Sequence, residues 1–137
     1  MRDYEFRGKR LDNGEWVYGS LTVRLVDGYL DHSKKCYFIQ YDYMNNYGQV
    51  FTDKFEVDPS TIGQFTGLVD KNGKKIYEGD VVKGKEWERG TSHRHIGIVE
   101  YISSSFRSVG INKYLGYHGS VDGSYEVIGN IHDKENE

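Results

Sequence analysis

The sequence predicts an all-β fold with few or no helices, and three observations support this. The chain of 137 residues contains 17 glycines and no alanine, and alanine is the best helix former while glycine is among the poorest. Short runs of β-branched and aromatic residues recur between turn residues such as Asn13-Gly14. Aromatic residues make up 15% of the chain, a content typical of a folded protein rather than a disordered one.

The first half of the chain is predicted to form hairpins. Asn13-Gly14 is the strongest local signal for a hairpin with a type I′ turn. The alternation of apolar and polar residues after it indicates a half-buried strand, and the run CYFIQYDY is rich in strand formers. Turns are predicted at Asp27-Gly28 and at residues 45–48. Strands are predicted near residues 4–7, 15–18, 20–26 and 36–43.

The second half is predicted to form a small, partly open, SH3-like barrel. Asn72-Gly73 marks a second hairpin turn. Residues 84–94 are polar and are predicted to form a loop, whereas residues 95–102, 106–111 and 125–131 read as strands. We expect about seven to ten strands in all. The predicted organisation is an N-terminal hairpin or sheet region over residues 1–57, a barrel-like region over 58–132, and a frayed tail over 133–137.

The single cysteine, the N-terminus and the hydropathy pattern predict a cytoplasmic protein. The net charge is -3 and neither half is basic, which argues against strong nonspecific binding to DNA or anionic lipid but leaves a local basic patch open. The single cysteine excludes an internal disulfide and favours a reducing compartment. The N-terminus has no apolar stretch of the signal-peptide kind, and no run is long enough to cross a membrane.

A basic and aromatic segment is the first candidate binding site. Cations that contact phosphates and a ring that stacks on bases are what single-strand binding requires. The alternative is a solvated, charged hairpin tip, and in either case we expect the segment to be exposed and mobile. The candidate residues are Lys83, Lys85, Trp87, Arg89, His93, Arg94 and His95.

His93 and His95 are the nearest approach to a metal signal. Histidines two apart on a strand point to one face and can share a metal ion. No cysteine or third histidine lies close in sequence, so we predict no metal site and no cofactor. No pattern of nucleophile, base and orienting group is recognisable either, and we predict that the protein is not an enzyme.

Three tyrosines form a second candidate surface. Tyr37, Tyr41 and Tyr43 share one side of a predicted strand, and Phe38 lies on its other side. A strand that is apolar on both sides is either enclosed in the fold or offered to a partner. Core packing and an interface therefore both remain open, and self-association is the simplest interface.

Two ordered blocks resemble a known family. The string from Val57 to Leu68, VDPSTIGQFTGL, and the continuation from Asp70 to Val82, DKNGKKIYEGDVV, are similar to the YopX family of bacteriophage and prophage proteins. The ending Tyr125–Ile131 and the opening Phe6-Arg7 fit the same family. The chain departs from it after Ile131, where the acidic, proline-containing segment common in the family is missing. The resemblance implies a β-rich fold and a phage or prophage origin, and no catalytic residues.

Together these observations predict a phage or prophage accessory protein that binds rather than catalyses. The first hypothesis is a protein-interaction module that recognises a host or phage protein or a second copy of itself. The second hypothesis is a nucleic-acid-binding module that uses residues 83–95. An enzyme is the third alternative.

Overall fold

The computed structural model describes residues 4–26 and 34–133, so the predicted turn at Asp27-Gly28 and the tail beyond Asp133 lie outside the described residues. The chain forms two compact units that divide between Gln64 and Phe65. The predicted all-β class is confirmed, because the described residues contain strands and only two 3-10 turns, η1 (Pro59–Thr61) and η2 (Asn112–Tyr114). None of the described segments is a helix long and apolar enough to span a membrane.

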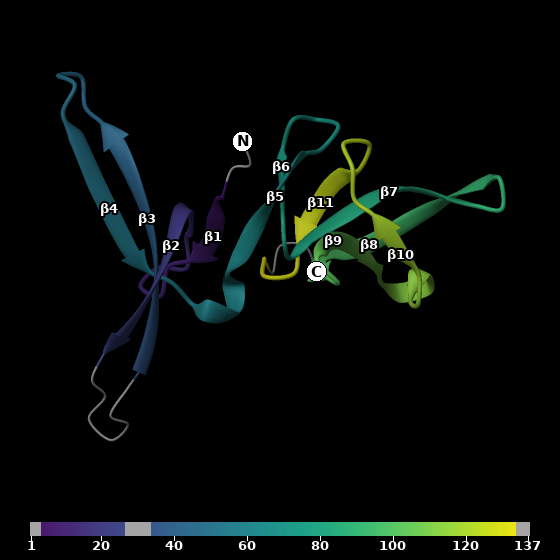
Figure 1. The fold of residues 1–137 in the computed structure, drawn as a ribbon, viewed down its shortest axis with the longest axis horizontal. Coiled ribbons are helices and arrows are strands. Elements are labelled where there is room, and N and C mark those ends of the chain that lie inside the picture. Colours follow the sequence, from purple (N-terminus) through teal and green to yellow (C-terminus); the bar gives the residue numbers. More distant parts are fainter. Residues whose placement is uncertain (1–3, 27–33, 134–137) are drawn as a thin grey trace. The chain divides into compact units, whose positions relative to one another are not determined.

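The first unit is an antiparallel sheet with one small core. Strands β2 and β3 pair along most of their length, and β3 continues with β4 into a long ribbon (Figure 1). Val17, Ile39 and Val57 form the buried cluster. The strand order is β4-β3-β2-β1-β5, comprising β1 (Phe6–Lys9), β2 (Trp16–Val26), β3 (Lys34–Met44), β4 (Val50–Glu56) and the beginning of β5 (Gly63–Val69).

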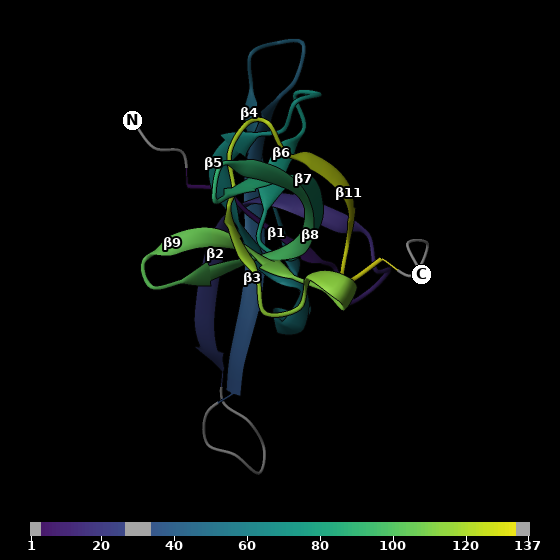
Figure 2. The same ribbon diagram turned by 90° about the vertical axis from the view of Figure 1, so that its right-hand side faces the viewer.

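The second unit contains a five-stranded antiparallel sheet that stays open and does not close into a barrel. Apart from this sheet, the rest of β5 pairs with β6. The turn between β8 and β9 stands out from the sheet (Figure 2). The sheet order is β10-β9-β8-β7-β11, and the strands of this unit are β6 (Lys75–Tyr77), β7 (Asp80–Glu88), β8 (Thr91–Ile102), β9 (Ser105–Gly110), β10 (His118–Ser120) and β11 (Glu126–Asn130).

Tyr125 is the centre of the second core. It is completely buried and packs with Ile76, Val82, Val99 and Val121. Its ring lies flat against the backbone of β7, where a Cβ at Gly84 would stand 2.7 Å from the nearest ring carbon. The glycine at this position therefore makes room for the largest buried side chain of the unit.

The loops at residues 10–15, 45–48 and 70–74 occur where the sequence predicts them, but the predicted type I′ turn at Asn13-Gly14 is wrong. A type I′ turn needs positive φ at both central residues, and of this pair only Gly14 (φ 74°) has it. The chain instead forms a longer loop closed by the bond from the Arg10 N–H to the Glu15 carbonyl. At Arg89-Gly90 both central residues have positive φ (51° and 80°). The sequence did not predict a turn at these two residues.

Asp70 organises the second predicted turn. Its Oδ1 accepts the backbone N–H groups of Asn72 (2.8 Å) and Lys74 (2.9 Å), while its Oδ2 accepts that of Val127 in β11 (3.0 Å). Burial raises the pKa of this carboxyl, but the hydrogen bonds from these three N–H groups outweigh that effect and leave the pKa below its ordinary value. One carboxylate thus closes the turn and fixes it to the last strand.

Candidate functional site

The hairpin of β7 and β8 carries most of the predicted basic segment. The loop prediction for residues 84–94 is wrong, because they form two paired strands joined by the two-residue turn at Arg89-Gly90. The hairpin runs beyond the rest of its unit to an exposed tip (Figure 1). The predicted exposure is correct for Trp87, which is 75% exposed, and wrong for His95, which is 3% exposed.

Alternation along the strands sorts the segment into two faces. Residues opposite each other in an antiparallel pair lie on the same face, and neighbours along a strand lie on opposite faces. Lys85 is opposite Arg94, so these two share a face with the alternate residues Lys83 and Trp87. We call the side with these four residues the basic face. The other side, the pocket face, carries Gly84, Glu86, His93 and His95.

The basic face borders a shallow hollow of about 240 Å³. Lys71, from the turn organised by Asp70, adds a fourth cation to Lys83, Lys85 and Arg94. Glu126 lies between two of them, with its Oε2 3.4 Å from Lys71 Nζ and 3.8 Å from Lys83 Nζ. Within the described part of the chain, no ion pair neutralises Lys85 or Arg94. The hollow therefore carries an excess of positive charge on a protein whose net charge is negative.

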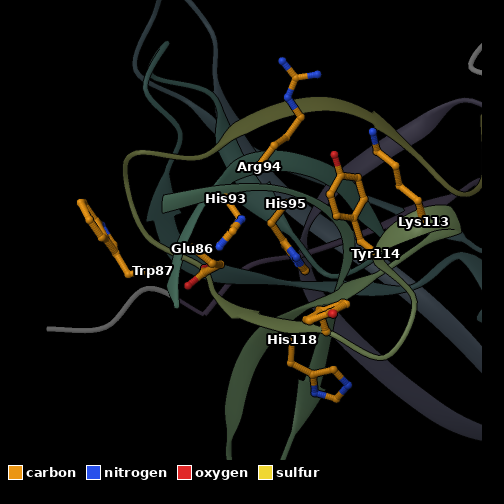
Figure 3. Close-up of a pocket in the computed structure, with 9 residues that line it drawn as sticks. Glu86, Trp87, His93, Arg94, His95, Lys113, Tyr114 and His118 are labelled. Carbon is orange, nitrogen blue, oxygen red and sulfur yellow. The ribbon is translucent and has the colours of Figure 1, made fainter. Parts of the chain in front are cut away.

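The pocket face opens into a second hollow, about 510 Å³ in volume. Figure 3 shows the side chains of Glu86, His93 and His95 close together at its centre, whereas the Arg94 side chain extends away from them. Arg94 lines this pocket as well as the basic hollow, so the two are adjacent at that residue. The complete lining is Glu86, Trp87, His93, Arg94, His95, Lys113, Tyr114, Tyr117 and His118.

His95 forms the floor of the pocket. Its Nε2 lies 3.1 Å from the carbonyl oxygen and 3.0 Å from the Oγ of Ser108, which is itself completely buried. The rings of Tyr114 and Tyr125 meet the imidazole edge-on, with centroids at 6.0 Å and 6.5 Å. These contacts fix the imidazole in place, and His95 is thus a structural part of the pocket wall.

Glu86 is held by Tyr125 of the core, whose hydroxyl donates a hydrogen bond to Glu86 Oε1. Burial, followed by this bond to a carboxylate, raises the pKa of Tyr125 above its ordinary value. The phenol therefore stays protonated and remains a donor. The Glu86 carboxylate, which lines the pocket, is therefore held by a group that belongs to the core.

The opposite wall of the pocket is formed by residues 113–118. The sequence did not connect this segment with the hairpin. The bond from the Ile111 N–H to the Ile96 carbonyl (3.1 Å) ties the η2 segment to β8. The Gly110 N–H and the Tyr117 carbonyl (2.8 Å) close the loop that carries Lys113 and the two tyrosines. His118 reaches the pocket from β10. No sequence signal relates residues 113–118 to residues 86–95, because the relation arises only from the pairing of β8, β9 and β10.

The predicted tyrosines of β3 lie in the first unit and separate into two environments. Tyr37 packs against the Val17, Ile39 and Val57 cluster. Tyr43 is exposed on the β3–β4 ribbon and Tyr41 is half-buried there, with ring centroids 6.3 Å apart. Tyr43 stacks on Phe51 of β4 at 5.6 Å, and Tyr41 lies 6.1 Å from Phe55. We call Tyr41, Tyr43, Phe51 and Phe55 the aromatic row.

Metal binding finds no support in the geometry of the described residues. His93, His95 and His118 line the same pocket. Even so, no group of three or more histidine, cysteine, aspartate or glutamate side chains in the described segments is arranged to hold a metal ion.

Comparison with known proteins identifies the family and the fold. The crystal structure of protein EF1440 from Enterococcus faecalis is 22% identical, covers 100% of both chains and has a TM-score of 0.52, a similarity that shows the fold alone. No curated protein matches. The family model described as YopX protein matches residues 5–136. The resemblance read from the sequence blocks is therefore confirmed, and the chain belongs to the YopX family.

Proposed function

We propose that the second unit binds single-stranded nucleic acid through the basic face of the β7–β8 hairpin. The observation that carries this proposal is the alternation that puts Lys83, Lys85, Trp87 and Arg94 on one face, with Lys71 beside them. Cations that follow a phosphate backbone next to an aromatic ring that stacks on bases are the common pattern of single-strand binding. Because the net charge is negative, bulk charge gives no attraction to phosphates, and binding depends on the local cations of this face.

The exposed Trp87 favours a single strand over a duplex. Its side chain is 75% exposed at the end of a two-stranded hairpin, where its ring is available to an unpaired base. The bases of a duplex are already stacked on one another and offer no free face to such a ring. A duplex is therefore expected to bind more weakly than a single strand of equal length.

Removing one cation from the basic face is expected to weaken binding and reduce its dependence on salt. With three or four phosphates contacted, the logarithm of affinity should fall against the logarithm of salt concentration with a slope of about -2 to -3. Lys85→Ala or Arg94→Ala should each reduce this slope by roughly 1. Fluorescence anisotropy of a labelled oligonucleotide, titrated at several salt concentrations, measures both quantities.

Two further variants complete this test. Trp87→Ala should weaken binding by about 1–3 kcal/mol and leave the slope unchanged, because it removes stacking and not a phosphate contact. Lys35→Ala is the matched control, since it removes an exposed lysine from the first unit. Equal effects of Lys35→Ala and Lys85→Ala, or binding that does not depend on salt, would contradict the proposal.

A second candidate function, protein interaction by self-association, is favoured by the aromatic row. Tyr43 and Phe51 are 46% and 43% exposed although their rings stack on each other. Exposed rings in a row are typical of contact surfaces, and a second copy of the chain is the simplest partner. A host or phage protein as the partner, the phage origin and the absence of catalysis remain predictions.

If the protein self-associates through the aromatic row, we expect a dimer that one substitution in the row dissociates into monomers. Tyr43→Lys should shift the sedimentation equilibrium toward the monomer, because it places a charge within the row. Tyr47→Lys is the control, since Tyr47 is 90% exposed in the turn of the same ribbon and outside the row. A wild-type protein that is monomeric at every accessible concentration would exclude this candidate.

A further inference from the structure

We infer that the pocket beside the basic face takes up one unpaired guanine base of the bound strand and recognises it through Glu86. This inference rests on the proposed function, because it assigns a base specificity to the same hairpin. The pocket and the basic hollow share Arg94. A strand that lays its phosphates on the basic face is therefore close enough to turn a base over Arg94 into the pocket.

The pocket has the size and walls of a base site. Its volume of about 510 Å³ lies within the range of roughly 300–1,000 Å³ that is usual for small-molecule sites. The rings of His95, Tyr114 and Tyr117 contribute to its walls, and Tyr117 is 57% exposed. Flipped or unpaired bases are commonly held by such stacking surfaces, which accept any base by its flat face. The rings alone therefore supply affinity and no preference among bases.

Glu86 supplies the preference. An ionised carboxylate accepts hydrogen bonds and donates none. The Watson–Crick edge of guanine presents two adjacent donors, N1–H and the N2 amino group, which match the two carboxylate oxygens. Adenine, cytosine and thymine each present an acceptor next to their donor, and that acceptor would face a carboxylate oxygen. Because the Tyr125 hydroxyl occupies only part of the accepting capacity of Oε1, Glu86 retains the capacity for both guanine donors.

The position of Glu86 in the hairpin supports this role. It lies on the pocket face opposite His93, and Figure 3 shows its side chain beside those of His93 and His95. Lys113, whose Nζ lies 5.4 Å from the centre of the Tyr114 ring, and Arg94 provide cations for the phosphates on either side of the base. A carboxylate near a nucleic-acid site repels phosphates in general, so its presence there is better explained by a contact with base donors.

The test compares four oligonucleotide sequences, each made as DNA and as RNA, and two variants of the protein. The strands are about ten nucleotides long and consist of thymine in DNA or uracil in RNA. One central nucleotide is replaced by guanine, adenine or cytosine, or is left unchanged. The wild type should bind the guanine strand about 5- to 100-fold more tightly than the others. Glu86→Gln should reduce this preference to within about twofold, because the amide pairs a donor with an acceptor. It should leave the salt slope unchanged, since the basic face is intact.

Glu86→Gln is suited to this test because it retains the fold. The glutamine carbonyl still accepts the Tyr125 hydroxyl, and circular dichroism checks the structure. Glu100→Gln, an exposed site on β8, is the matched control and should keep the guanine preference. Equal affinity for all four strands, or a preference that survives in Glu86→Gln, would overturn the guanine site while leaving salt-dependent strand binding in place. No salt-sensitive binding to any strand would overturn the proposed function and this inference with it.

Discussion

Replacing Tyr125 with alanine is expected to lower the free energy of unfolding of the second unit by about 3–5 kcal/mol. The side chain is completely buried among Ile76, Val82 and Val99, so its removal leaves a cavity between the strands that form the sheet. The hairpin should lose order as well, because the ring supports Gly84 and the hydroxyl orients Glu86. Urea unfolding followed by circular dichroism measures the loss, and amide hydrogen exchange localises it to β7, β8 and β11.

Two other substitutions separate packing from hydrogen bonding at this position. Tyr125→Phe keeps the ring and removes only the bond to Glu86, so it should cost no more than about 1–3 kcal/mol. Tyr47→Ala removes a tyrosine that is 90% exposed and should stay within about 0.5 kcal/mol of the wild type. If Tyr125→Ala were no more destabilising than Tyr47→Ala, Tyr125 would not be the centre of the core.

Removing the Asp70 carboxylate is expected to be the second large effect on stability. Three backbone N–H groups, from Asn72, Lys74 and Val127, donate to it. Asp70→Ala leaves these donors without their acceptor, which should cost about 2–4 kcal/mol. Asp70→Asn retains a carbonyl oxygen but presents an amino group to at least one donor, and it should fall between the alanine variant and the wild type.

The dependence on pH gives this prediction a distinct signature. Because the folded-state pKa of Asp70 lies below its ordinary value, the carboxylate stabilises the fold fully above the unfolded-state pKa of about 3.9 and loses that contribution as the pH falls through the folded-state pKa. Urea midpoints measured from about pH 6 down to about pH 2 should therefore converge for wild type and Asp70→Asn. A constant difference over this range would contradict the assignment.

The sequence predicted the fold class and several loop positions, but it missed the turn at Arg89-Gly90 and did not predict the turn types. Asn72-Gly73 marks its loop correctly, yet only Gly73 has positive φ (84°). The Asp70 carboxylate, rather than a pair of left-handed residues, closes that loop. Arg89-Gly90 and Ser103-Ser104 have positive φ at both positions, because each connects directly opposed strands by two residues. The length of the connection decided the backbone conformation there, and the side chains gave no signal of it.

The hairpin itself could not be predicted from apolar alternation. Beyond Gly84, neither face of β7 and β8 is covered by the core, so polar residues occupy both faces and the period of two disappears from the hydropathy pattern. The sequence did identify the cations and Trp87 as a candidate site. It did not identify Glu86 as a base-reading group or the residues of the opposite wall, because their proximity depends on strand order and not on spacing.

The register of the β7–β8 hairpin also limits how this segment can change in length. Odd-numbered residues of β7 build the basic face and even-numbered ones the pocket face, so deleting or inserting a single residue within one strand exchanges the two sets from that point to the tip. The lysines would then point into the pocket and Glu86 onto the basic face. Without a β-bulge, length changes that keep both surfaces must add or remove two residues in each strand.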